Sequence, residues 1–246
     1  MCCVKTGSGA LMETLPDALA LAQTMVDIGK LAGKPVVAVI TSMAQPLGTH
    51  IGNALEVKDA IDVLAGRTQG DLLEISLLLG SHMLVLAEKV KTLPEARAML
   101  ENALSSGAGL RKLAEMIAAQ GGDPRVVEDL SLLPQAAVKR VMRAETAGYL
   151  SAMDTTALGM AAQRMGAGRA KKSDMLDYSV GYVLHVRLGD EVTEDTLLAT
   201  LYARNEAEAE EAEKAIRKAL TIAKEKPQTP KLWDAVVTAE GITYNR

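Results

Sequence analysis

Apolar residues near the start of the chain follow two different patterns. From Thr14 to Gly33 they recur at helical spacing, and the segment opens with a hydroxyl cap, a proline in the first turn and an early acidic residue. The β-branched run 35–41 that follows is typical of a strand buried on both faces. Because a further strand end precedes the helix, residues 3–41 predict a βαβ unit with parallel strands.

Residues 54–120 continue with a helical pattern, interrupted at 66–70, 91–94 and 105–109 by glycine, proline and polar residues. The most apolar part, 72–87, contains Glu74 and His82 and is too short to span a bilayer. We therefore expect a buried helix there and no membrane segment.

The pattern changes after Pro134. Short apolar runs separated by glycine and aspartate predict strands within 137–154, 178–192 and 197–204, and helices are expected at 153–166 and 205–226. The predicted fold is α/β: a partial parallel or mixed sheet with helices, followed by an α+β C-terminal module. The expected domains are 1–133 and 134–246.

Composition narrows the function classes. Of the 246 residues, 48% are hydrophobic, and the 27 basic and 31 acidic side chains are mixed along the chain, which leaves no basic stripe for a nucleic acid. No basic-then-apolar leader opens the sequence, so we expect a cytoplasmic protein. Cys2 and Cys3 are adjacent, a spacing that suits neither CxxC redox chemistry nor zinc.

One glycine-rich loop is a candidate anion site. Gly7, Ser8 and Gly9 stand between the first predicted strand and the first helix, where a loop can hold a phosphate or simply make a tight turn. No GxxxxGK[ST] motif is present, and Met12 occupies the third glycine position of GxGxxG, so the P-loop and dinucleotide-binding patterns fail. The residues alone leave phosphate binding and a plain turn open.

A second loop, "TSMAQPLGTHIGNALEVKDAIDVL" at 41–64, leaves the carboxyl end of the next strand and enters a helix with Asn53 as the expected cap. Its glycines would let carbonyl oxygens converge on a hard cation, with Asp59 supplying negative charge. A plain connection between strand and helix is the simpler alternative.

Together the loops resemble one family, the thymidine and pyrimidine-nucleoside phosphorylases. "VKTGSGALM" resembles that family's "VKVGSGAFM", and "ITSMAQPLGTHIGNALEV" resembles "LTDMNQPLGxxxGNALEV". The segment "DTTALGMAAQRMGAGRAKKSDMLDYSVGY" is similar to its C-terminal module. The resemblance extends from residue 4 to about residue 240.

The resemblance implies an enzyme that cleaves a pyrimidine nucleoside with phosphate, giving the free base and a pentose 1-phosphate. In that family a "KHSTGG" loop with serines and threonines binds phosphate, and an arginine, a serine and a lysine bind the base. None of these motifs occurs in this sequence. We therefore expect the C-terminal half of such a phosphorylase, inactive alone, with an N-terminal half or a homo-oligomer as partner. The alternative is a non-catalytic remnant that acts as a protein-interaction module.

The resemblance also implies the site residues. Leu11 takes the position of an apolar residue that lies against the pyrimidine, and the loop of Gly7, Ser8 and Gly9 forms part of that pocket's wall. A potassium ion is the implied cofactor.

In that family backbone carbonyls and an acidic side chain bind the potassium ion, which corresponds here to Leu47, His50 and Asp59. The last of these is usually glutamate, so the side chain here is one carbon shorter. The segment 188–203 also resembles lipoyl and biotinyl barrels, but it has no lysine on the hairpin, so no organic cofactor is expected.

Overall fold

The structure is a computed structural model that describes residues 1–245. It consists of two compact units, each assembled from separated parts of the chain. The first comprises Met1–Ala44, Thr68–Ala108 and the C-terminal part from Pro230; the second comprises Gln45–Arg67 and Gly109–Thr229. These units interleave along the sequence. The expected division into domains 1–133 and 134–246 concerns the sequence and not these units, and it stays a prediction.

The first unit is built on a four-stranded sheet in the order β1-β2-β10-β11. Its strands are β1 (Cys2–Thr6), β2 (Ala38–Ser42), β10 (Trp233–Thr238) and β11 (Gly241–Tyr244). β1 and β2 are parallel and are joined through helix α1 (Leu15–Leu31), which confirms the predicted βαβ unit. β10 pairs antiparallel with β2, so the last strands of the chain complete the sheet begun by the first.

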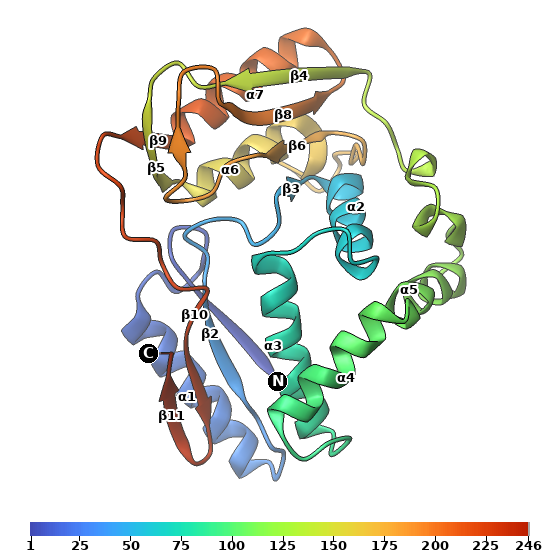
Figure 1. The fold of residues 1–246 in the computed structure, drawn as a ribbon, viewed down its shortest axis with the longest axis vertical. Coiled ribbons are helices and arrows are strands. Elements are labelled where there is room, and N and C mark those ends of the chain that lie inside the picture. The colour runs from blue at the N-terminus through green and yellow to red at the C-terminus, as the bar shows by residue number, and fades with distance from the viewer. Residues whose placement is uncertain (246) are drawn as a thin grey trace. The chain divides into compact units, whose positions relative to one another are not determined.

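Helix α1 forms where the sequence predicts it. The Thr14 hydroxyl accepts a hydrogen bond from the Asp17 amide, and Pro16 lies in the first turn. One face carries small and branched apolar residues, which pack with strand residues into a single core: Val4, Ala18, Ala22, Val26, Ala38, Ile40, Ala235 and Val237. Figure 1 shows α1 lying along this sheet. Small side chains on the helix let it approach the strands closely.

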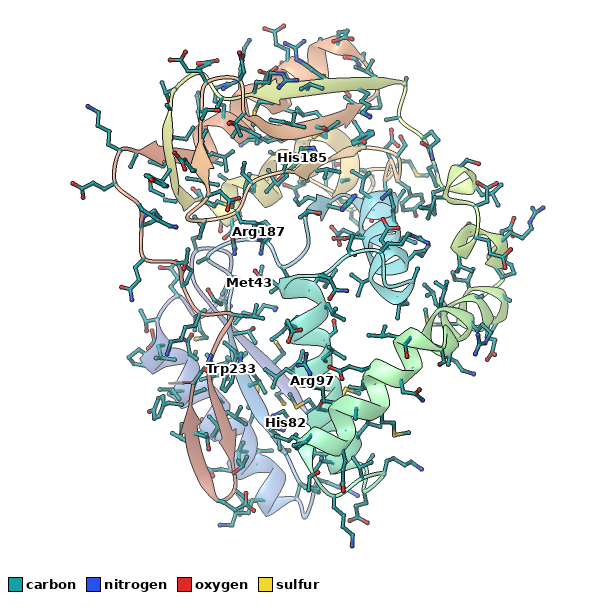
Figure 2. The ribbon with its side chains drawn as sticks, viewed as in Figure 1. Met43, His82, Arg97, His185, Arg187 and Trp233 are labelled. Carbon is teal, nitrogen blue, oxygen red and sulfur yellow. The ribbon has the colours of Figure 1, made fainter. Side chains whose placement is uncertain are left out.

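Helices α3 (Asp71–Leu86) and α4 (Leu93–Ser105) pack against each other in the same unit. Arg97 on α4 forms ion pairs with Glu74 on α3 and with Glu101 one turn further along α4; Figure 2 labels Arg97 and shows His82 on α3. The prediction of a buried helix at 72–87 is correct for one face only, since Met83 is 57% exposed. No helix among residues 1–245 has both the length and the apolar character needed to cross a bilayer.

The second unit contains α2 (Asn53–Leu64) and most of α5 (Ala108–Ala119), followed by 3-10 turns at Pro124–Val127 and Leu130–Leu132. Ile61 of α2 is fully buried, and Leu113 and Ile117 of α5 pack into the same cluster with Val126 and Val127. The breaks predicted within 54–120 overlap those of the structure, which lie at 65–70, 87–92 and 106–107.

Two further sheets complete this unit. One has the order β3-β6-β8-β4, the other β7-β5-β9. The strands are β3 (His50–Ile51), β4 (Val138–Arg143), β5 (Gly148–Met153), β6 (Gly181–Leu184), β7 (Glu191–Val192), β8 (Leu197–Ala203) and β9 (Leu220–Ala223). Helix α6 (Thr155–Ala162), extended by a π-helical turn at Gln163–Ala167, packs against α7 (Glu206–Ala219), and α7 lies along β4 and β8 (Figure 1).

The helix predicted at 205–226 is too long. Helix α7 ends at Ala219, and the next four residues form β9, which pairs antiparallel with β5. Pairing with a strand far away in the sequence overrides the helical pattern at these positions. The α/β class with a C-terminal α+β part is confirmed.

Candidate functional site

The glycine-rich loop leaves β1 at the carboxyl ends of two parallel strands. The Met43 amide, just after β2, donates to the Thr6 carbonyl at 2.6 Å, and the Ser42 amide donates to the Leu232 carbonyl at 3.0 Å. Loops that follow parallel strands emerge at the same edge of a sheet, which is the usual ligand-binding edge. Figure 2 labels Met43 after β2 and Trp233 at the start of β10.

The loop itself is a tight turn whose first glycine is required. Gly7 has a φ of +99°, and a Cβ built on it would lie 3.0 Å from the Ala44 backbone nitrogen. Its amide donates to the Glu13 carbonyl, and its carbonyl accepts from Ala10. A side chain at position 7 would therefore meet both backbone strain and a close backbone neighbour.

The side chain of Leu11 is 91% exposed beside this turn. A large apolar side chain that is left almost fully in water is available to cover one face of an apolar or aromatic ligand. The role of Leu11, Gly7, Ser8 and Gly9 in binding a pyrimidine stays a prediction.

Strand β10 brings residues to this edge that the sequence did not single out. Trp233 is opposite Thr41 in the sheet register, and Asp234 hydrogen-bonds with Thr6. Burial raises the pKa of Asp234, against the opposing effects of Lys231 and Thr6. The run "DAVVT" has strand character, but nothing in it indicates that its partner is β2.

The second loop leads into β3 and α2, and contacts with the Asp59 side chain hold it in place. The Asp59 side chain is buried, with 5% exposure of the residue, and one oxygen accepts from the Thr49 amide at 3.2 Å. The other oxygen lies 3.5 Å from Nδ1 of His50, and this nitrogen also contacts the Thr49 hydroxyl at 3.0 Å. The structure therefore brings the His50 side chain to Asp59, whereas the ion assignment concerns the His50 carbonyl and stays a prediction.

The electrostatics of Asp59 favour a carboxylate. Desolvation by burial has the largest single effect and raises its pKa, but the His50 side chain and the amides of Thr49 and His50 together lower the pKa below the ordinary value. At neutral pH the segment therefore contains a buried negative charge.

The donors assigned to the ion are, by their chemistry, of the type that a hard monovalent cation prefers, and ion binding by them stays a prediction. They are backbone carbonyl oxygens at Leu47 and His50 and one ionised carboxylate, which are oxygen ligands of the kind that replace the hydration shell of potassium. Within the described residues, no group of three or more histidines, cysteines, aspartates and glutamates gathers as a metal cluster. The Thr49 carbonyl, which lies between Leu47 and His50 in sequence, accepts from the Leu184 amide at 2.8 Å and is not counted among the donors.

The predicted cap of α2 is wrong. Gly52, with a φ of +132°, is the cap residue, and Asn53 is the first residue of the helix. The Asn53 amide side chain donates instead to the Ala167 carbonyl at 2.9 Å, and Glu56 accepts from the Gly52 amide at 3.2 Å. A Cβ on Gly52 would lie 2.4 Å from the Val180 carbonyl oxygen, so close packing on the strand segment 180–181 selects glycine there.

Arg187 also contacts the second loop, although the sequence did not indicate this. Its Nη1 donates to the Pro46 carbonyl at 2.6 Å, across 141 residues of sequence. Such a contact leaves no local signal in the sequence, because it depends on the pairing of β6 with β3.

Comparisons with known proteins place both loops in one family. Residues 1–110, which include both candidate loops, match the model of the glycosyl transferase family, a/b domain. Residues 149–223 match the pyrimidine nucleoside phosphorylase C-terminal domain.

Similar proteins agree with these matches. The pyrimidine-nucleoside phosphorylases of Geobacillus stearothermophilus and Bacillus subtilis (strain 168) are 50% and 49% identical over 203 residues, which cover 82% of this chain and 47% of each relative. That of Staphylococcus aureus (strain USA300) is 46% identical over 220 residues, 89% of this chain and 51% of the relative. The chain thus spans about half the length of these relatives. It belongs to the pyrimidine-nucleoside phosphorylase family.

Proposed function

We propose that this chain serves the phosphorolysis of pyrimidine nucleosides and supplies one wall of the base pocket and an ion-binding loop. The observation that carries the proposal is that both candidate loops lie inside the matched residues 1–110. The relatives named above, at 46–50% identity, are pyrimidine-nucleoside phosphorylases.

In the proposed reaction a phosphate oxygen forms a bond to the anomeric carbon of the pentose while the bond from that carbon to the base nitrogen breaks. The base leaves with the electron pair, and the sugar has oxocarbenium character in the transition state. Catalysis then depends on cationic donors that stabilise the leaving base and hold the phosphate. Leu11 and the turn at Gly7–Gly9 would cover the base and exclude water.

We assign those cationic donors to a segment that corresponds to the half of the relatives outside the match. The phosphate and base motifs of the family do not occur in the printed sequence. Lysine and arginine side chains therefore have to be contributed by another segment before both reactants can be bound.

The same proposal includes a potassium ion held by the Leu47 and His50 carbonyls and the Asp59 carboxylate. When bound, the ion would supply a fixed positive charge within the loop. The buried, ionised Asp59 supports this assignment, because its carboxylate places a negative charge in the loop that would attract a cation.

Complementation tests this function. The chain is assayed alone, and mixed with the N-terminal half of the Bacillus subtilis relative, for phosphate-dependent release of thymine from thymidine and uracil from uridine. We expect turnover in the mixture only, and none without phosphate. A mixture that forms a complex but releases no base would contradict the proposal, and so would turnover by the chain alone.

A second candidate is a protein-interaction module, favoured by one observation. β1 lies at the edge of its sheet, and no strand among residues 1–245 pairs with its outer side. An open edge can accept a further strand through backbone hydrogen bonds. Stable association of the two halves without base release would favour this function.

We further propose that the chain acts in the cytoplasm. Cys2 and Cys3 are free thiols in the structure, as is common in a reducing compartment. Cell fractionation with an antibody against the chain would test this location.

A further inference from the structure

The irregular segment 45–48, which leads into β3, is fixed by contacts from the segment after β6. The Leu188 amide donates to the Gln45 side-chain oxygen at 2.9 Å, and Nη1 of Arg187 donates to the Pro46 carbonyl at 2.6 Å. Three residues after Pro46, the Thr49 carbonyl accepts from the Leu184 amide at 2.8 Å. Because these contacts lie on both sides of Leu47, the loop is held by hydrogen bonds before and after this residue.

The Arg187 contact is the strongest of these three by type. A guanidinium N–H donates with a full positive charge, and charge-assisted hydrogen bonds are roughly twice as strong as neutral ones. The Pro46 carbonyl and the Leu47 amide form one planar peptide group, so a hydrogen bond to this oxygen orients the whole group. Arg187 therefore sets the plane of the peptide that precedes Leu47.

The turn that carries Arg187 is itself rigid. The Arg187 amide donates to the Asp190 carboxylate at 2.7 Å, and the Asp190 amide donates back to the Arg187 carbonyl at 3.1 Å. Leu150 of β5 then exchanges backbone hydrogen bonds with both Gly189 and Asp190. The half-buried Arg187 thus extends from a turn anchored in a sheet; Figure 2 labels it on this segment.

We propose that Arg187 is a positioning residue for the ion loop: by holding the Pro46 carbonyl it orders the Leu47 and His50 carbonyls for a monovalent cation. This inference rests on the ion site within the proposed function. Groups that orient ligands without touching the metal typically change metal affinity by 10–100-fold when they are removed. If the Arg187 guanidinium only repelled a nearby cation, its removal would instead strengthen potassium binding.

The test uses the whole chain and potassium chloride as the probe. Potassium chloride replaces choline chloride at constant ionic strength, while the amide chemical shifts of Thr49 and His50 and the thermal midpoint are followed. We expect Arg187→Met to weaken potassium binding at least about tenfold, and Arg187→Lys to weaken it less because one charged donor remains. Hydrogen exchange of the Thr49 amide should become faster in the Met variant without potassium.

Arg143→Met is the matched control. Nη1 of Arg143 donates to the Asp195 carbonyl at 2.7 Å, which is the same type of contact outside the ion loop, and its loss should leave the potassium affinity unchanged. Unchanged or tighter binding in Arg187→Met would overturn the inference. An equal loss in Arg143→Met, or no potassium-specific effect in the unsubstituted chain, would also overturn it. Failure of the phosphorolysis assay with these potassium effects intact would contradict only the proposed reaction.

Discussion

The backbone amide of Thr49 donates to the buried carboxylate of Asp59 at 3.2 Å. This bond joins the loop before β3 to the second turn of α2, and the neighbouring His50 ring lies 3.5 Å from the other carboxylate oxygen. The acidic side chain therefore shapes the loop, in addition to the ion-binding role proposed for it.

Asp59→Asn should lower the free energy of unfolding by about 1–3 kcal/mol, because an amide group would replace one of the acceptor oxygens that face the Thr49 and His50 donors. Urea unfolding in choline chloride measures the effect without potassium. The control is Glu115→Gln, which changes an exposed carboxylate paired with Lys112 and should cost well under about 1 kcal/mol. Equal stabilities for the two variants would contradict the structural role of Asp59.

Gly181→Ala should be among the most damaging small substitutions in the second unit. Gly181 has a φ of +147°, and its added Cβ would lie 2.1 Å from the Ile51 carbonyl oxygen, where β6 pairs with β3. Backbone strain and overpacking together should cost about 3 kcal/mol or more. Chemical denaturation with circular dichroism measures this loss.

The matched glycine is Gly159, inside α6, where an added Cβ meets nothing within 4 Å. Gly159→Ala should be neutral or stabilising by roughly 0.5–1 kcal/mol, because alanine favours the helix and has less freedom when unfolded. If both variants lost the same stability, close backbone packing could not explain the effect at Gly181.

His82 should make the protein less stable in acid. Burial on α3 lowers its pKa below the ordinary value of 6.5, so the unfolded chain binds the proton more readily than the folded one. Its contribution is complete above the unfolded pKa and is lost as the pH falls through the lower folded pKa, with a slope of at most about 1.4 kcal/mol per pH unit.

Urea unfolding at pH 7.5 and pH 5.5 tests this for the unsubstituted chain and for His82→Gln. The variant should lose less stability between the two values, although His185, whose pKa is also lowered, is present in both proteins. Identical losses would rule out His82 as a source of the acid sensitivity.

Leu11→Ala should affect the reaction and leave the fold intact. Because the side chain is 91% exposed, its truncation removes little packing, and the unfolding midpoint should stay unchanged. In the complemented assay KM for thymidine should rise about tenfold, which corresponds to the apolar area lost from one face of the base. Leu31→Ala, at an 89% exposed leucine at the end of α1, is the control, and equal KM values for both variants would contradict the assigned role of Leu11.

The sequence by itself determined the features that depend on neighbouring residues. The cap at Thr14, the apolar period of α1 and the run that forms β2 predicted a parallel βαβ unit, and the structure confirms it. The two glycine-containing loops also carried enough local identity to indicate the family. Helix caps, turns and periodicity act over a few residues, so they can be recognised in a single sequence.

The tertiary structure decided which distant segments meet. It placed β10 beside β2, turned residues 220–223 from a predicted helix end into a strand, and brought Arg187 to the Pro46 carbonyl. These pairings depend on backbone hydrogen bonds between segments far apart in the sequence, and nearly any residue can make such bonds. Local residue types therefore do not encode the choice of partner, which follows only when whole sheets and helices pack together.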